Sequence, residues 1–186
     1  MTLREKYGEW GIILGATEGV GKAFCERLAK EGMNVVMVGR REEKLKELGE
    51  ELKNTYEIDY KVVKADFSLP DATDKIFAAT ENLDMGFMAY VACLHSFGKI
   101  QDTPWEKHEA MINVNVVTFM KCFYHYMKIF AAQDRGAVIN VSSMTGISSS
   151  PWNGQYGAGK AFILKMTEAV ACETEKTNVC LLYTSD

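Results

Sequence analysis

The chain has 186 residues, 47% hydrophobic and 25% charged, with a formal net charge of −4, which predicts one soluble globular domain large enough to bury a core. The mild acidic balance argues against binding to a nucleic-acid backbone, which needs a basic face. Because the N-terminus lacks an apolar signal region and no run approaches the roughly 20 apolar residues of a membrane span, we expect a cytoplasmic protein without a membrane span.

Strand-like and helix-like segments alternate along the chain. The expected strands cover residues 10–14, 34–38, 60–65, 86–92, 137–142 and 178–183. The expected helices cover residues 21–31, 42–54, 71–81, 105–132 and 156–174. Apolar strands that alternate with helices predict a parallel sheet with helices on both faces. We therefore expect a single α/β domain over residues 1–186, a doubly wound three-layer α/β/α Rossmann fold that binds ligands at the carboxyl ends of its strands.

A glycine-rich segment follows the first strand and opens the first helix. It reads G-A-T-E-G-V-G and contains Gly15, Thr17, Glu18, Gly19, Val20 and Gly21. Glycines let the backbone turn tightly and approach a pyrophosphate, while the helix N-terminus offers unpaired N–H groups and the positive end of the helix dipole. This context predicts a dinucleotide-binding loop. The alternative is a turn that only packs a helix against a strand.

The end of the second strand distinguishes NAD(H) from NADP(H). A carboxylate there would bond the ribose 2′-hydroxyl, whereas an arginine accommodates a 2′-phosphate. Here Arg40 and Arg41 follow Gly39, and no carboxylate occupies the position. Because guanidinium–phosphate contacts are strong and geometrically specific, NADP(H) is favoured over NAD(H). In the alternative interpretation, both arginines are surface charges that pair with Glu42 and Glu43.

A second group of polar residues lies near the end of the chain. Tyr156 and Lys160 are one helical turn apart, and Ser143 follows the fifth strand at the ligand-binding rim. A neighbouring ammonium lowers the pKa of a phenol, so Tyr156 would exchange a proton with a carbonyl or alcohol oxygen. Lys160 would also bond the nicotinamide ribose, and Ser143 would hold the substrate oxygen. The five cysteines and three histidines show no metal-ligand spacing, so we expect no metal.

Together these motifs resemble the short-chain dehydrogenase/reductase family, in its form with T-G-x3-G-x-G and Y-x3-K sequences. The resemblance covers residues 10–179, and the spacing from Ser143 to Tyr156 fits it, which selects Ser143 over Ser142. It implies an NADP(H)-dependent oxidoreductase that transfers a hydride between the nicotinamide and a small-molecule carbonyl or alcohol. It also implies a homodimer or homotetramer built partly from helix 105–132.

The resemblance assigns further roles along the rim. Asn115, within V-N-V, corresponds to the family's catalytic asparagine, which holds a water in a proton relay through Lys160. Asp66, followed by Phe67 in A-D-F-S, corresponds to the adenine-contacting aspartate, and we expect both residues at the cofactor. Ala92 is expected there too, within Y-V-A-C where the family has N-N-A-G. That change should remove a polar contact that steadies the central sheet.

The C-terminus departs from the resemblance. The family continues through a Pro-Gly turn and a substrate-binding segment to a seventh strand, whereas this chain reads C-L-L-Y-T-S-D over Cys180–Asp186. We therefore expect a sheet without its last strand or strands, and we hypothesise that residues 180–186 are not native.

Two other functions stay open beside the enzyme. One is a non-catalytic nucleotide-binding module, an inactive fragment that keeps the glycine loop alone. The other is an interaction protein, because helix 105–132 has wide apolar coverage for a surface helix. For the enzyme, the loop Met144–Gln155 would line the substrate pocket, and Trp152 indicates an apolar or flat substrate.

Overall fold

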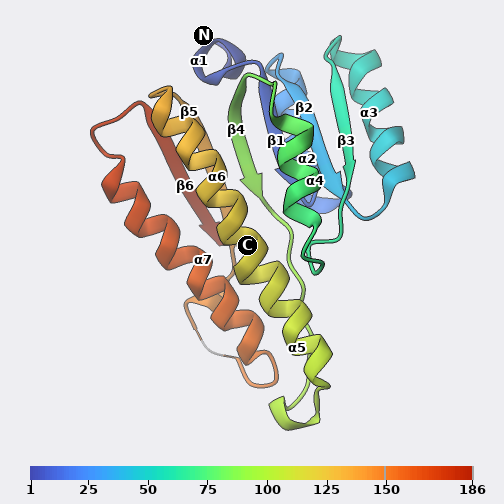
Figure 1. Cartoon of the computed structure of the whole chain (residues 1–186), viewed down its shortest axis with the longest axis vertical. Coiled ribbons are helices and arrows are strands. Elements are labelled where there is room, and N and C mark those ends of the chain that lie inside the picture. The colour runs from blue at the N-terminus through green and yellow to red at the C-terminus, as the bar shows by residue number, and fades with distance from the viewer. Residues whose placement is uncertain (149, 186) are drawn as a thin grey trace.

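The computed structural model describes residues 1–148 and 150–185. Ser149 of the expected substrate loop and Asp186 of the C-terminal heptapeptide lie outside the described residues. Six strands form one sheet in the order β3-β2-β1-β4-β5-β6, and every neighbouring pair is parallel (Figure 1). The strands are β1 (Trp10–Leu14), β2 (Asn34–Gly39), β3 (Tyr60–Lys64), β4 (Met85–Tyr90), β5 (Gly136–Ser142) and β6 (Val179–Ser185). The predicted doubly wound sheet is confirmed, and its strand order reverses between β1 and β4.

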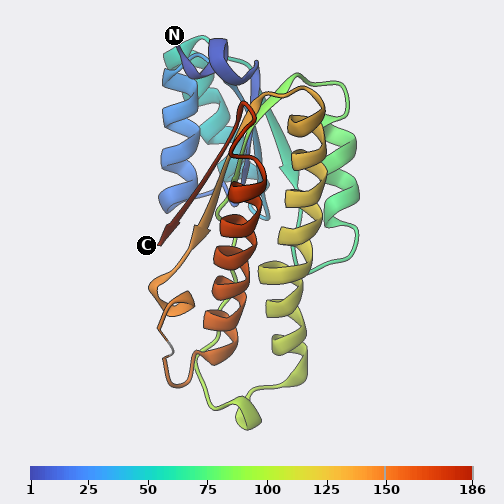
Figure 2. The same cartoon turned by 90° about the vertical axis from the view of Figure 1, so that its left-hand side faces the viewer.

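Helices cover both faces of the sheet. They are α1 (Leu3–Tyr7), α2 (Gly19–Lys30), α3 (Glu42–Tyr56), α4 (Ala72–Thr80), α5 (Trp105–Ile112), α6 (Phe119–Ala132) and α7 (Gly154–Glu173). Seen from the side, α2 and α3 lie on one face, and α4, α6 and α7 lie on the other (Figure 2). The sequence analysis did not predict α1, a short helix closed by a capping box between Thr2 and Glu5.

Two hydrophobic cores fill the spaces between the sheet and its helices. Successive residues of β1 point to opposite faces, so Ile12 and Leu14 pack with α4 and α6 while Ile13 packs with α2 and α3. All three side chains are fully buried. Burial of each such side chain is worth about 1.5–3 kcal/mol, which fixes the strands whose carboxyl ends carry the candidate site.

The predicted helix 105–132 contains an irregular segment. Between α5 and α6 the chain forms the π-helical segment η2 (Asn113–Thr118), in which Asn115 lies. The neighbouring strand meets this segment through Tyr90, whose buried hydroxyl donates a 2.6 Å hydrogen bond to the carbonyl oxygen of Val114. At the Y-V-A-C segment, where the resemblance implies the loss of a polar contact, Tyr90 thus supplies a polar contact of its own.

Most of the apolar coverage of α6 belongs to the core. Phe119, Phe123 and Phe130 are buried against the sheet, whereas Tyr124 is 60% exposed. The surface that α6 leaves for a partner is thus smaller than the sequence predicted, and Tyr124 is its exposed large aromatic residue.

The last strand runs through most of the unusual C-terminal heptapeptide. β6 pairs in parallel with β5, and Cys180 lies beside Ala137 in the register. Among the described residues, no helix has the length and apolar character needed to cross a membrane. The cytoplasmic location stays a prediction.

Candidate cofactor and catalytic site

The glycine loop lies at the carboxyl end of β1, where the strand order reverses. Gly15 has a φ of 102°, and a Cβ there would lie 2.7 Å from the backbone nitrogen of Ala92. A Cβ on Gly21 would lie only 2.0 Å from the carbonyl oxygen of Gly15. Glycine is therefore required at both positions, because a side chain at Gly15 would strike the backbone after β4 and one at Gly21 would push the loop away from α2.

The first turn of α2 is left open toward solvent by its own cap residue. Glu18 is the N-cap, but its side chain makes no capping hydrogen bond to the helix. Gly19, Val20 and Gly21 form this first turn, with Gly19 and Val20 exposed. Uncapped N–H groups at the positive end of a helix dipole suit a pyrophosphate, so the loop fits the dinucleotide that the sequence predicts.

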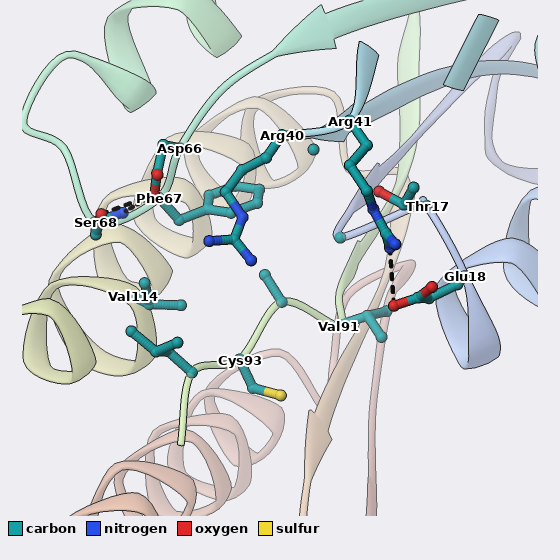
Figure 3. A pocket seen from close by; sticks show the side chains of 14 residues that line it. Thr17, Glu18, Arg40, Arg41, Asp66, Phe67, Ser68, Val91, Cys93 and Val114 are labelled. Carbon is teal, nitrogen blue, oxygen red and sulfur yellow. Dashed lines mark hydrogen bonds and ion pairs between the residues drawn. The ribbon is translucent and has the colours of Figure 1, made fainter. Parts of the chain in front are cut away.

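Beside the loop lies a cavity of about 260 Å³ at the ends of β1, β2, β3 and β4 (Figure 3). Several predicted cofactor residues line it together, namely Gly15, Thr17, Glu18, Arg40, Asp66, Phe67 and Ala92. Other lining residues were not singled out as cofactor contacts by the sequence, namely Ser68, Val91, Cys93, Leu94 and Val114. Most of them directly follow β3 or β4, so their position after a strand was the available signal.

Asp66 is held in place by its neighbour two residues along. Its Oδ1 accepts hydrogen bonds from the backbone N–H of Ser68 at 3.0 Å and from the Ser68 hydroxyl at 2.7 Å. Partial burial alone would raise the pKa of Asp66, but the Ser68 bonds and the charge of Arg40 together hold that pKa below its usual range. The carboxylate is therefore ionised at neutral pH and fixes the turn after β3.

The two arginines after β2 behave differently. Arg41 forms an ion pair of 2.8 Å with Glu18, and the hydrogen bond and charge of Arg41 lower the pKa of that carboxyl. Arg40 makes no ion pair within residues 1–148 and 150–185, and it lines the cavity (Figure 3). The alternative partners are wrong, since Glu42 pairs with Lys46 and Lys64, and Glu43 pairs with Lys46.

Lys160 and Tyr156 lie close together on α7. The Lys160 side chain is 1% exposed, and its Nζ donates a 2.6 Å hydrogen bond to the carbonyl oxygen of Val141. That nitrogen lies 5.7 Å from the centroid of the Tyr156 ring. The ammonium therefore lies beside the aromatic ring of Tyr156.

The two serines that end β5 differ in their surroundings. Ser142 is fully buried, and its hydroxyl donates to the carbonyl oxygen of Lys160 at 2.8 Å. Ser143 is half-buried, and its Oγ accepts hydrogen bonds from the N–H and the hydroxyl of Thr145. Ser143 is thus the less buried of the two serines, and its role at a substrate oxygen stays a prediction.

The side-chain amide of Asn115 binds the backbone of Leu94 at both of its polar atoms. Its Oδ1 accepts from the N–H of Leu94 at 3.0 Å, and its Nδ2 donates to the carbonyl oxygen of Leu94 at 2.7 Å. A Cβ on Gly159 would lie 2.9 Å from the Cβ of Asn115, so α7 packs closely on η2 here. Both polar atoms of the Asn115 amide thus bond the backbone after β4. The role of Asn115 in a water relay through Lys160 stays a prediction.

His95 is a site residue that the sequence did not reveal. It follows β4, its side chain is exposed, and its ring meets the Tyr156 ring edge-on at 5.8 Å between centroids. The sequence analysis found no role for it because a lone histidine in a loop carries no spacing signal.

A second, larger cavity of about 960 Å³ lies between the start of α5 and the loop that leads into α7. Apolar side chains dominate its lining, among them Ile100, Trp105, Met111, Ile112 and Trp152. Gln155, which precedes Tyr156, lies in the same wall and donates a 2.7 Å bond to the carbonyl oxygen of His108. Part of the predicted substrate loop therefore does line an apolar cavity of ligand size.

Within the described part of the chain, no cluster of three or more His, Cys, Asp or Glu side chains is arranged to hold a metal.

The family model described as short chain dehydrogenase matches residues 9–183. The chain belongs to the short-chain dehydrogenase family. It is accordingly an oxidoreductase of that family, with a fold that binds nicotinamide cofactors.

Curated relatives share most of this sequence. A 7β-hydroxysteroid dehydrogenase of Collinsella aerofaciens is 82% identical over 179 residues, which are 96% of this chain and 68% of the relative. A 7β-hydroxysteroid dehydrogenase of Clostridium sardiniense is 45% identical over 185 residues, which cover this chain fully and 71% of the relative.

Solved structures agree with the fold of this short-chain dehydrogenase. One, from work on 7β-hydroxysteroid dehydrogenase stereoselectivity, has a TM-score of 0.95 and 79% identity, covering 99% of this chain and 73% of the other. A short-chain dehydrogenase from Sphingobium yanoikuyae in complex with NADPH has a TM-score of 0.89 at 23% identity, covering 94% and 69%. At that identity the second match concerns the fold alone.

Proposed function

We propose that this chain is an NADP(H)-dependent hydroxysteroid dehydrogenase, which interconverts a 7β-hydroxyl group and the corresponding ketone. The observation that carries the proposal is the 82% identity to the Collinsella aerofaciens enzyme. The apolar cavity beside the start of α7 supports it, because a large, flat substrate would pack against Trp105 and Trp152.

Tyr156 is the proposed proton donor to the ketone oxygen and the proposed proton acceptor in the reverse reaction. The Lys160 ammonium, fixed by the Val141 carbonyl, stabilises the phenolate that remains after proton transfer. Ser143 donates its hydroxyl proton to the substrate oxygen and so holds the carbonyl in position. Bound NADP(H) supplies or accepts the hydride.

The cofactor is assigned to the cradle around the glycine loop. The open first turn of α2 would hold the pyrophosphate, and the cavity beside Asp66 and Phe67 would hold the adenosine. Arg40 and Arg41 would hold a 2′-phosphate, which is the basis for preferring NADP(H).

The test combines binding with stereochemistry. We expect NADPH to bind more tightly than NADH in a fluorescence titration, and a 7-keto steroid to be reduced to its 7β-hydroxyl product. Tyr156→Phe should lower kcat by about 10²–10⁴-fold and leave the NADPH Kd within about twofold. If neither cofactor binds, the glycine-loop assignment fails. If cofactor binds and no steroid turns over, the alternative of a non-catalytic nucleotide-binding module holds.

We also propose a homodimer or homotetramer that uses the exposed face of α6 around Tyr124, since that large aromatic side chain is 60% exposed. Tyr124→Glu should lower the oligomeric mass measured by light scattering. Thr55→Glu, at an exposed position on α3, adds the same single negative charge away from α6 and should leave the mass unchanged. An unchanged mass in the Tyr124 variant would count against this surface.

A further inference from the structure

Glu18 and Arg41 face each other across the mouth of the cofactor cavity (Figure 3). Glu18 comes from the loop between β1 and α2, and Arg41 is the N-cap residue of α3. Their side chains are 71% and 43% exposed, and the carboxylate and guanidinium lie 2.8 Å apart. The Glu18 carboxylate therefore pairs with Arg41 and does not cap the N-terminus of α2.

Two other charged residues, Arg40 and Asp66, line the same cavity as Glu18 and Arg41. Arg40 lines the cavity close to Asp66, and its charge acts on that carboxylate. Arg41 acts in the same way on Glu18, so both carboxylates are ionised at neutral pH. An adenosine 2′-phosphate that enters this cavity would be attracted by both arginines and repelled by Glu18.

We propose that Glu18 is a specificity-determining residue, whose carboxylate holds Arg41 in the free protein and competes with the 2′-phosphate of NADP(H) for that guanidinium. The inference rests on the proposed use of NADP(H). A phosphate takes Arg41 from Glu18, because bidentate guanidinium–phosphate bonds are stronger than an exposed ion pair. Glu18 thus lowers the affinity for 2′-phosphorylated ligands and leaves the affinity for NAD(H) unchanged.

The main experiment compares Glu18→Gln with the wild type. The probes are adenosine 2′,5′-bisphosphate and ADP, measured by calorimetry, and NADPH and NADH, measured by nicotinamide fluorescence. We expect the variant to bind the two 2′-phosphorylated ligands roughly three- to fivefold more tightly, which is the upper part of the range of an exposed ion pair. The Kd values for ADP and NADH should stay within about twofold.

Glu26→Gln is the matched control. Glu26 lies on α2, pairs with Lys22 at 3.5 Å, is 44% exposed and does not line the cavity. Its substitution removes the same charge from the same helix and should leave all four Kd values unchanged. Equal tightening by both glutamine variants would overturn the proposal, because the effect would then come from net charge.

A double variant separates competition for Arg41 from simple repulsion. In an Arg41→Gln background there is no guanidinium to release, so Glu18→Gln should improve 2′,5′-bisphosphate binding less than it does in the wild type. A gain of the same size in both backgrounds overturns the proposal. So does weaker binding by Glu18→Gln alone, which would mean that Glu18 orients Arg41 for the phosphate.

Failure of the proposed function has a different signature. The cofactor assignment is judged on the wild type, by whether NADPH binds more tightly than NADH. The role of Glu18 is judged on the ratio between variant and wild type for each probe. A wild type without NADPH preference therefore refutes the cofactor assignment, while the variant ratio still decides the role of Glu18.

Discussion

Gly21→Ala is the substitution that most directly tests the glycine loop as a cofactor cradle. The added Cβ would lie 2.0 Å from the carbonyl oxygen of Gly15 and 2.9 Å from its carbon. Non-bonded heavy atoms normally stay about 3.5–4.0 Å apart, so the loop and the start of α2 must separate by roughly 1.5 Å. This shift moves the N–H groups that would receive the pyrophosphate.

The expected magnitude follows from that displacement. Overpacking of this kind costs about 1–3 kcal/mol, and in a domain of this size 2 kcal/mol lowers Tm by roughly 4–8 °C. We expect the NADPH Kd to rise by at least about tenfold, which corresponds to 1.4 kcal/mol of lost binding. Calorimetric melting and a fluorescence titration measure the two effects.

Gly154→Ala is the control for Gly21→Ala. A Cβ on Gly154, the first residue of α7, meets no atom within 4 Å, so this variant should melt at or slightly above the wild-type temperature and bind NADPH normally. If Gly21→Ala also kept its Tm and its NADPH affinity, the close contact between loop and helix would not be what shapes the cradle.

Three further substitutions test separate parts of the structure. Tyr90→Phe removes the buried hydrogen bond to the Val114 carbonyl and should lower the free energy of unfolding by about 1–2 kcal/mol in urea, with the cofactor Kd little changed. The pKa of Asp66 is lower in the folded chain than in the unfolded chain, so its contribution to stability is present above the unfolded pKa and is lost as the pH falls below about 4. Asp66→Asn should therefore flatten the acid limb of a stability profile, and an unchanged limb would contradict the reasoning. Trp152→Ala should raise the KM for a steroid several-fold without altering the NADPH Kd, and equal KM values would exclude the apolar cavity as the substrate site.

The sequence predicted the parts of this structure that depend on local pattern. The alternation of apolar strands and helices was enough for the sheet, and the glycine-rich segment was enough for the turn between β1 and α2. The family resemblance selected Ser143 over Ser142 by its spacing to Tyr156, and Ser143 is the less buried of the two, while its catalytic role stays a prediction. These features could be predicted because each shows as a pattern of residues that lie close together in the sequence.

Other features depend on contacts between distant segments. The pair of Glu18 and Arg41 joins two separate loops, and the sequence had offered only Glu42 and Glu43, which directly follow the arginines, as alternative ion-pair partners. The π-helical turn at η2 looks in sequence like ordinary helix, because what stabilises it lies on β4 and α7. His95 meets Tyr156 only because two strands end at the same rim.

The π-helical segment connects the two halves of the site. Val114 lines the cofactor cavity, and its carbonyl oxygen accepts a hydrogen bond from the Tyr90 hydroxyl. The side chain of Asn115, the next residue, bonds both the backbone N–H and the backbone carbonyl oxygen of Leu94. Gly159, the residue before Lys160, packs against the Cβ of the same asparagine. One irregular turn thus fixes a wall of the proposed adenosine site and the helix that carries Tyr156 and Lys160. A regular helix would rotate every residue beyond the irregularity by about 100°, so the two walls could not both keep these contacts.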